Sequence, residues 1–201
     1  QTYTKTVHGN GYAIKGLNAP LFNNLGANVK GLHLEDVEFT SIANATTRIG
    51  ALACYYYGSS ISNCSISGDI TLTRKSSVRT QIGGLVSDIK QTCTISDCVN
   101  KCNINLTITD DTATSALHMI GGLVNDAIAG SGTLSLSNCI NEATISVSGN
   151  SQNIVSVGGL LSRQETMALR ADKCHNRGAI TVNLTEYNDA FVGGIYGYSN
   201  K

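Results

Sequence analysis

The chain has 201 residues and a formal net charge of zero; 41% of its residues are hydrophobic and only 14% are charged. This length fits one domain, and the hydrophobic fraction is too high for a disordered chain. Because no basic run is longer than Arg74-Lys75 and no apolar run approaches 18 residues, the sequence predicts neither nucleic-acid binding nor a membrane span. Polarity comes instead from 20 Ser, 20 Thr and 19 Asn. No signal-peptide pattern is present, so we expect Gln1 to begin a mature chain or an internal segment.

The first 48 residues carry glycine-rich and apolar segments at 9–17, 19–22 and 29–37. Within them Leu32, Leu34 and Val37, followed by Phe39, predict a strand. We interpret this region as the opening coils of the repeat array that follows.

Two sequence blocks recur from residue 49 onward. The first is an apolar residue, two small residues and a second apolar residue, with copies that begin at Ile49, Ile82, Ile120, Val157 and Val192. Its spacings are 33, 38, 37 and 35 residues. The second block ends at Cys64, Cys98, Cys139 and Cys174. A repeat of this length is the mark of a solenoid or another repeat array.

Positions after each of these cysteines alternate in chemistry, which is typical of a strand with one buried face. The expected core columns are Ile70, Ile104, Ile145, Ile180 and Leu72, Leu106, Val147, Val182. The expected outward columns are Thr71, Asn105, Ser146, Thr181 and Thr73, Thr107, Ser148, Asn183. A small-residue column at Gly68, Cys102, Ala143 and Gly178 predicts a tight turn or a close approach to a neighbouring coil. The variable lengths fall at 109–116 and 127–132, which we expect to be projecting loops.

These observations predict an all-β fold, a right-handed parallel β-helix of about 35 residues per coil that forms a single domain over 1–201. Residues 49–201 would supply four repeats and the start of a fifth. A fold built of helical repeats does not fit, because the alternation has period two and because the motif contains glycine pairs, which disfavour a helix. Near Lys201 we expect an open or loop-covered coil end without a packed helix.

The repeated Ile-Gly-Gly-Leu-Val and the Asn-Cys-x-Asn-x-Gly-x-Ile pattern, preceded by Gly-Asn-Gly-Tyr-x-Ile-Lys-Gly-Leu and Pro-Leu-Phe, resemble the GLUG-motif repeats. Those repeats occur in bacterial surface proteins, notably of gut Bacteroidetes, and beside the peptidase domain of some immunoglobulin A proteases. The resemblance implies a right-handed β-helix on a secreted or surface-anchored protein and supplies no catalytic residues. The sequence departs from the pattern at Ala51 and at Ala171-Asp172-Lys173, which blurs the repeat boundaries.

Four of the seven cysteines occupy one column of the repeat, so we expect them to stack inward as reduced thiols. Parallel stacking places their Cβ atoms side by side, which does not suit a disulfide. Cys54, Cys93 and Cys102 lie outside the column, and a single bridge among them stays open. Only Cys98-x-x-x-Cys102 is closely spaced, so no zinc site or other metal is predicted.

Enzymatic β-helices place carboxylates or cations on equivalent positions of neighbouring coils, and the outward columns identified above hold Thr, Ser and Asn. The acidic pairs Glu35-Asp36 and Asp110-Asp111 stand alone, the first on a predicted strand and the second in a loop. Histidines at 8, 33, 118 and 175 are scattered, and neither a His-Glu-x-x-His motif nor a Gly-x-Ser-x-Gly elbow is present. The sequence therefore predicts no enzymatic activity and no cofactor.

Tyrosines are the candidate ligand-binding residues, because sugars stack on aromatic faces. Alternation would expose Tyr55 and Tyr57 on one face, and Tyr196 and Tyr198 add a second pair. The competing interpretation is that these rings cover coil ends or pack under loops. The hydroxyl columns also allow an ice-binding surface, but only Thr71-x-Thr73 keeps the strict pattern and exposed strand positions favour threonine in any case.

The sequence thus predicts a non-catalytic, extracellular or outer-surface module, an adhesin-like stalk or ligand-presenting scaffold of a bacterial protein. A host glycan or surface protein would be its partner. The alternative is a carbohydrate-binding or accessory segment of a larger peptidase or glycan-degrading protein.

Overall fold

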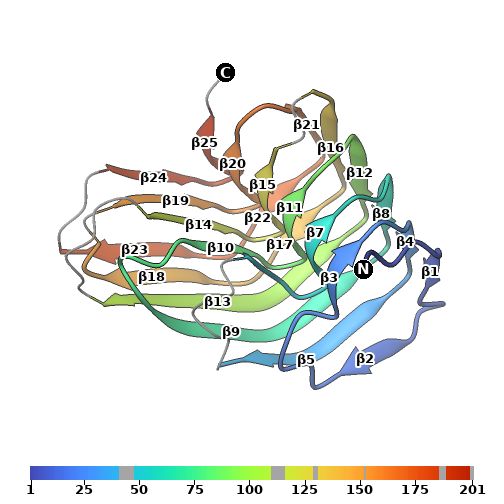
Figure 1. Cartoon of the computed structure of the whole chain (residues 1–201), viewed down its shortest axis with the longest axis horizontal. Helices are drawn as coiled ribbons and strands as arrows, with labels where there is room; N and C mark the ends of the chain where they lie inside the picture. The colour runs from blue at the N-terminus through green and yellow to red at the C-terminus, as the bar shows by residue number, and fades with distance from the viewer. Residues whose placement is uncertain (41–47, 110–115, 129–130, 152, 186–188, 200–201) are drawn as a thin grey trace.

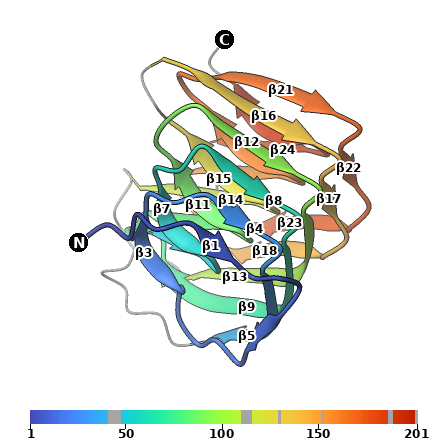
Figure 2. The ribbon, with the colours of Figure 1, turned by 90° about the vertical axis from the view of Figure 1, so that its right-hand side faces the viewer.

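The computed structural model describes residues 1–40, 48–109, 116–128, 131–151, 153–185 and 189–199. Its regular elements are β-strands, and every strand pairing is parallel. Successive coils stack from the blue N-terminal end to the red C-terminal end (Figures 1 and 2). Within the described residues no helix is long and apolar enough to cross a membrane.

Four parallel sheets run along the stack. Sheet A contains β3 (Phe22–Leu25), β7 (Ala53–Tyr56), β11 (Val86–Ile89), β15 (Val124–Ala127), β20 (Leu161–Gln164) and β25 (Tyr196–Ser199). Sheet B contains β1 (Val7–His8), β4 (Val29–Lys30), β8 (Ser60–Ser62), β12 (Cys93–Ser96), β16 (Thr133–Ser137) and β21 (Ala168–Asp172). Sheet D contains β6 (Arg48–Gly50), β10 (Thr80–Gly83), β14 (Leu117–Gly121), β19 (Ile154–Gly158) and β24 (Asp189–Gly193).

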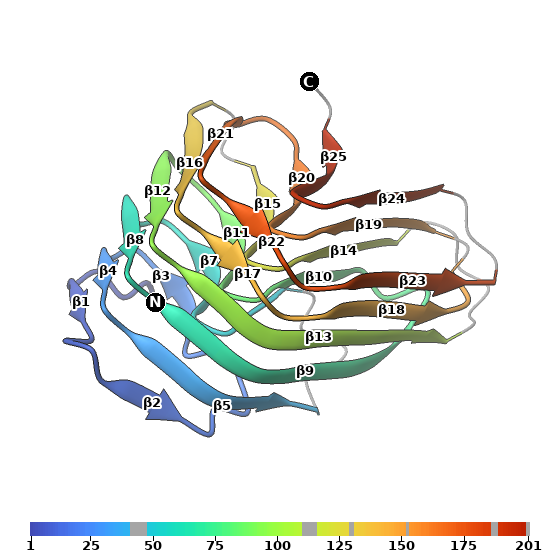
Figure 3. The ribbon, with the colours of Figure 1, turned by 180° about the vertical axis from the view of Figure 1, so that it is seen from behind.

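Sheet C is the longest layer. It contains β2 (Ala13–Lys15), β5 (His33–Phe39), β9 (Ser65–Lys75), β13 (Val99–Thr109), β17 (Ile140–Asn141), β18 (Ile145–Gly149), β22 (His175–Asn176) and β23 (Ile180–Leu184). In Figure 3 the strands β9 and β13 are seen to bend and continue along the whole side of the molecule. The order of strands in all four sheets confirms the predicted parallel β-solenoid, while its right-handed sense stays a prediction from the crossover rule.

The coil interior holds the apolar columns that alternation predicted. Ile70, Ile104 and Ile145 pair in register and are completely buried, whereas the Thr and Ser between the core positions face outward. The last members of these columns, Ile180 and Val182, are only half-buried. No described strand stacks on β23 from the other side, so this end of the core is uncovered.

The tight corner of each coil lies one residue before the column cysteine. Asn63, Asp97, Asn138 and Lys173 have φ values between 50° and 54°, the left-handed region that asparagine and aspartate tolerate best. The small-residue column predicted as a turn or a close approach is the latter, since β9 runs through Gly68 and β13 through Cys102. A Cβ on Gly68 would lie 2.2 Å from the carbonyl oxygen of Val37.

A ladder of buried amides follows the corner. The Nδ2 of Asn100 donates to Oδ1 of Asn141 at 2.7 Å, and the Nδ2 of Asn141 donates to Oδ1 of Asn176 at 2.8 Å. The second glycines of the repeat pack against it: a Cβ on Gly122 would lie 2.7 Å from the Asn141 amide carbon and 2.0 Å from the carbonyl oxygen of Gly159. Neighbouring coils therefore stack through both the glycine and the asparagine of the motif.

All seven cysteines are free thiols. Cys64, Cys98 and Cys139 are buried in one column, and Cys174 is half-buried at its uncovered end. Their thiols donate to backbone carbonyls, as Cys139 does to Ile95 at 3.3 Å. The ladder of reduced thiols is thus confirmed, and no bridge forms among Cys54, Cys93 and Cys102.

Candidate functional site

Two columns of side chains face each other where sheets D and A meet, and we call the space between them the corner groove. Sheet D contributes Arg48, Gln81, Met119, Ser156 and Phe191, which pair in register from strand to strand. Sheet A contributes Tyr55, Asp88, Asp126, Arg163 and Tyr198, also in register. Contacts across the groove join Arg48 to Asp88, Met119 to Arg163 and Phe191 to Tyr198.

The strands of sheet A reach this groove by breaking the regular alternation of a β-strand. In β11 the core residues are Val86 and Ile89, three positions apart, and Ser87 and Asp88 between them make polar contacts outside the core. β15 repeats the arrangement with Val124 and Ala127 in the core. In both strands two successive side chains therefore point away from the core. The second of them, Asp88 or Asp126, is buried where sheets D and A meet.

The end of the groove nearer the N-terminus is filled by an ionic cluster around Asp88. Its carboxylate lies 2.5 Å from Nε of Arg48 and 3.3 Å from Nζ of Lys90, and it accepts a hydrogen bond from Nδ2 of Asn125 at 3.2 Å. The ring of Tyr55 contacts both cations, with Arg48 5.1 Å and Lys90 5.3 Å from its centroid. These interactions satisfy a completely buried carboxylate, as burial of a charge requires.

Asp126, one coil further along, is buried with fewer hydrogen bonds and a more distant cation than Asp88. Neither of its carboxylate oxygens accepts a hydrogen bond from a described side chain, and its nearest cation, Nη1 of Arg163, lies 3.9 Å from Oδ2. Burial raises the pKa of Asp126 to about 7, with the neighbouring Asp88 acting in the same direction and Arg163 opposing it. Close to neutral pH this carboxyl group can therefore hold a proton inside the groove.

Replacement of Asp126 by Asn is expected to remove a pH dependence of stability. The ordinary pKa of Asp is 3.8 and the folded value is about 7, so between about pH 4 and pH 7 the folded chain retains a proton that the unfolded chain releases. The contribution of Asp126 to the free energy of unfolding therefore falls as the pH rises through this range.

Buried His118 has the opposite slope below pH 6.5, because its folded pKa is lowered to about 4. The measurement is therefore urea unfolding of the wild type and of Asp126→Asn at each pH, which cancels the histidine term. The stability of the variant relative to wild type should increase from pH 4 to pH 7. A difference that stays constant over this range would contradict the assignment.

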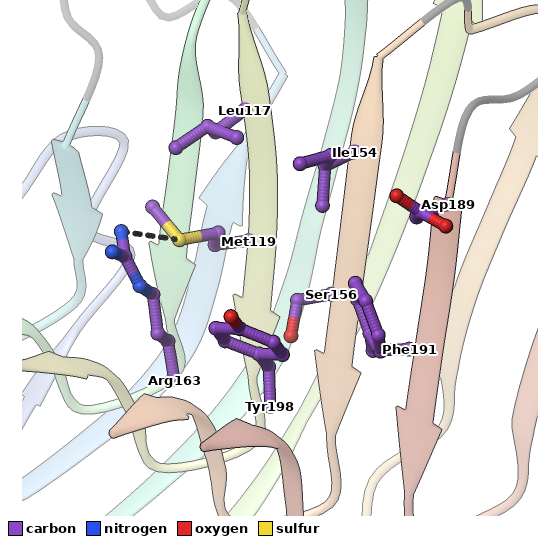
Figure 4. Close-up of a pocket in the computed structure, with 8 residues that line it drawn as sticks. All are labelled: Leu117, Met119, Ile154, Ser156, Arg163, Asp189, Phe191 and Tyr198. Atoms are coloured by element: carbon purple, nitrogen blue, oxygen red, sulfur yellow. Dashed lines mark hydrogen bonds between the residues drawn. The ribbon is translucent and has the colours of Figure 1, made fainter. Parts of the chain in front are cut away.

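Toward its other end the groove contains a pocket of about 260 Å³. Its lining is Leu117, Met119, Ile154, Ser156, Asp189 and Phe191 from sheet D, with Arg163 and Tyr198 from sheet A. Figure 4 shows Arg163 beside Met119 at one side, Asp189 at the other and the rings of Tyr198 and Phe191 between them. The ring centroids are 4.7 Å apart and the planes are inclined by 50°. Apolar walls with a few polar groups are typical of a ligand site.

The structure separates the four tyrosines that the sequence singled out. Tyr55 is half-buried within the ionic cluster, and Tyr57 is 40% exposed just after β7. Tyr198 shares the column of Tyr55 but lies four strands away, about 19 Å at 4.8 Å per strand. Tyr196 lies above Leu161 on a core column and is 47% exposed at the uncovered end. Only Tyr198 lines the pocket, and the predicted pair Asp110-Asp111 lies outside the described residues.

The charged residues of the sheet A column, Asp88, Asp126 and Arg163, are not among the residues predicted from the sequence. Each lies five residues after the first glycine of the repeated block, in a column that reads Tyr55, Asp88, Asp126, Arg163 and Tyr198. That column could have been found by aligning the copies on the glycines as well as on the cysteines. Among the described residues no group of three or more His, Cys, Asp or Glu could hold a metal ion.

Comparison with known proteins links the chain to a peptidase family. The family model described as the M26 IgA1-specific metallo-endopeptidase N-terminal region matches residues 2–68. The resemblance to GLUG repeat proteins is thereby confirmed. The match and the β-solenoid together fit the GLUG repeats that occur beside immunoglobulin A protease domains. The family model covers a third of the chain. Its match ends within β9, before the residues that line the pocket. A search of curated proteins finds no match.

Proposed function

We propose that this chain is a non-catalytic accessory module of a secreted or surface peptidase, and that it holds a protein ligand in the corner groove. The observation that carries the proposal is the pocket at β24 and β25, which has apolar walls and a few polar groups at one end of the corner groove. Such a concave surface on a stacked, rigid scaffold suits ligand presentation. The match to the N-terminal region of a peptidase family, as distinct from its catalytic part, supports an accessory role.

The partner that fits this role is a protein on which the attached peptidase acts. The matched family is named for action on immunoglobulin A1, so a host glycoprotein of that kind is the first ligand to consider. An adhesin-like stalk would need only the solenoid and no ligand in the groove. The two roles therefore differ in whether changes inside the groove abolish binding.

The test is binding of the purified chain to a defined peptide array and to a glycan array. We expect it to bind peptides, and we expect Tyr198→Ser to lose at least about tenfold in affinity, because the ring is a wall of the pocket. Tyr12→Ser is the matched control, since Tyr12 is 76% exposed and lies in the first coil. Glycan binding that is lost with Tyr57→Ala and kept with Tyr198→Ser would overturn the groove proposal in favour of a carbohydrate-binding module. Binding of neither class would also overturn it.

A further inference from the structure

The charges around the pocket favour a cationic ligand. Arg163 is already engaged, because its Nη2 lies 2.5 Å from Oε1 of Glu165 and its Nη1 lies 3.9 Å from Asp126. Asp189, exposed at the start of β24, makes no ion pair with any residue in the described part of the chain. The guanidinium of Arg163 is therefore paired with two carboxylates that do not line the pocket, and Asp189 is the one carboxylate among the lining residues.

The walls favour a ligand with a long apolar stem. Leu117, Met119 and Ile154 line the pocket on sheet D, and Ile154 is 36% exposed although it is a large aliphatic residue. The rings of Phe191 and Tyr198 are inclined to each other, so they do not form one flat platform for a sugar ring. An inclined pair instead offers an aromatic face to a cation and an edge to methylene groups.

We propose that the pocket accepts the side chain of a lysine or arginine in an extended peptide, an inference that rests on the proposed function and names its ligand class. The methylene stem lies against Leu117, Met119 and Ile154, and the cationic head points to Asp189 across the aromatic rings. An acidic side chain is rejected because it meets Asp189, while Arg163 is held by its own carboxylates.

The first test uses blocked pentapeptides of the form acetyl-Gly-Gly-X-Gly-Gly-amide, titrated into the isotopically labelled chain and followed by NMR. With X as lysine or arginine, binding should be about fivefold tighter than with norleucine, which keeps the stem and lacks the charge. Glutamate should bind more weakly than norleucine. Norleucine that binds as tightly as lysine would overturn this inference while leaving a peptide-binding groove in place. Absence of binding by every peptide would overturn both proposals.

The second test assigns the charge to Asp189. Asp189→Asn should lower the affinity for the lysine peptide about fivefold and leave that for the norleucine peptide unchanged. Asp172→Asn is the matched control, an exposed aspartate of the same coil that lies on sheet B and not at the pocket. Phe191→Ala should weaken both peptides, because it removes a wall that both contact. If Asp189→Asn leaves the preference of lysine over norleucine unchanged, the assignment is wrong.

Discussion

Gly122→Ala is expected to unfold the chain or to lower its free energy of unfolding by about 4 kcal/mol or more. The new Cβ would lie 2.0 Å from the carbonyl oxygen of Gly159 in the next coil and 2.7 Å from the Asn141 side chain. Both neighbours are fixed, the first as backbone and the second as a member of the buried amide ladder. Relief of the clash requires the two coils to separate, which would weaken the backbone hydrogen bonds on either side.

Gly194→Ala is the matched control because Gly194 occupies the same motif position in the last described coil. No atom lies within 4 Å of the Cβ that it would gain, and its backbone does not adopt a positive φ. Its stability should stay within about 0.5 kcal/mol of the wild type. Thermal and urea unfolding followed by circular dichroism compare the two variants. Similar losses in both would mean that the glycine serves local backbone geometry and not coil stacking.

Asn141→Asp is expected to be the most disruptive single change in the amide ladder. The wild-type Nδ2 donates to Oδ1 of Asn176 at 2.8 Å and to the carbonyl oxygen of Ala143 at 3.0 Å. In the aspartate variant a carboxylate oxygen would replace this donor and face two other oxygen acceptors, those of Asn176 and Ala143. The variant would also bury a charge without a counter-ion. We expect a loss of about 4 kcal/mol at neutral pH, against about 3 kcal/mol for Asn141→Ala, which only removes hydrogen bonds.

The pH dependence separates the two variants of Asn141. A buried carboxyl group with a raised pKa is less destabilising when it is protonated, so Asn141→Asp should recover stability relative to Asn141→Ala as the pH falls. Urea unfolding at pH 7 and at pH 4 provides the measurement, with the exposed Asn183→Ala as a control that stays near wild type. If Asn141→Asp and Asn183→Ala proved equally stable, the ladder would not contribute to the fold.

The solenoid could be predicted because its information is local and repeated. Ile70, Ile104 and Ile145 lie at the same offset from a column cysteine, and each is buried at the position that alternation assigns to the core. A parallel stack places equivalent residues above one another, so one alignment of the copies predicts many contacts at once. The same reasoning correctly anticipated the ladder of reduced thiols.

The left-handed corner of each coil was harder to predict from the sequence, although asparagine and aspartate are the residue types that favour it. Asn63, Asp97 and Asn138 precede the column cysteine, and each tolerates a positive φ. For Gly68 the sequence predicts a tight turn or a close approach to a neighbouring coil, and β9 continues there without a break. A small residue is needed there because the backbone of Val37 passes within contact distance, a close approach that depends on the neighbouring coil.

The coil, its core columns and its cysteine ladder could thus be derived from the residues alone, because period-two alternation repeated along the chain specifies which face is buried. The corner groove could not be derived in this way, because it depends on how two sheets pack together. In β11 the core residues Val86 and Ile89 are three apart, which hides Asp88 from an alternation argument. Its partner Arg48 is 40 residues away in the chain, and Arg163 meets Met119 across 44 residues. Such pairs exist only once sheets D and A meet, because the groove is a property of two packed layers.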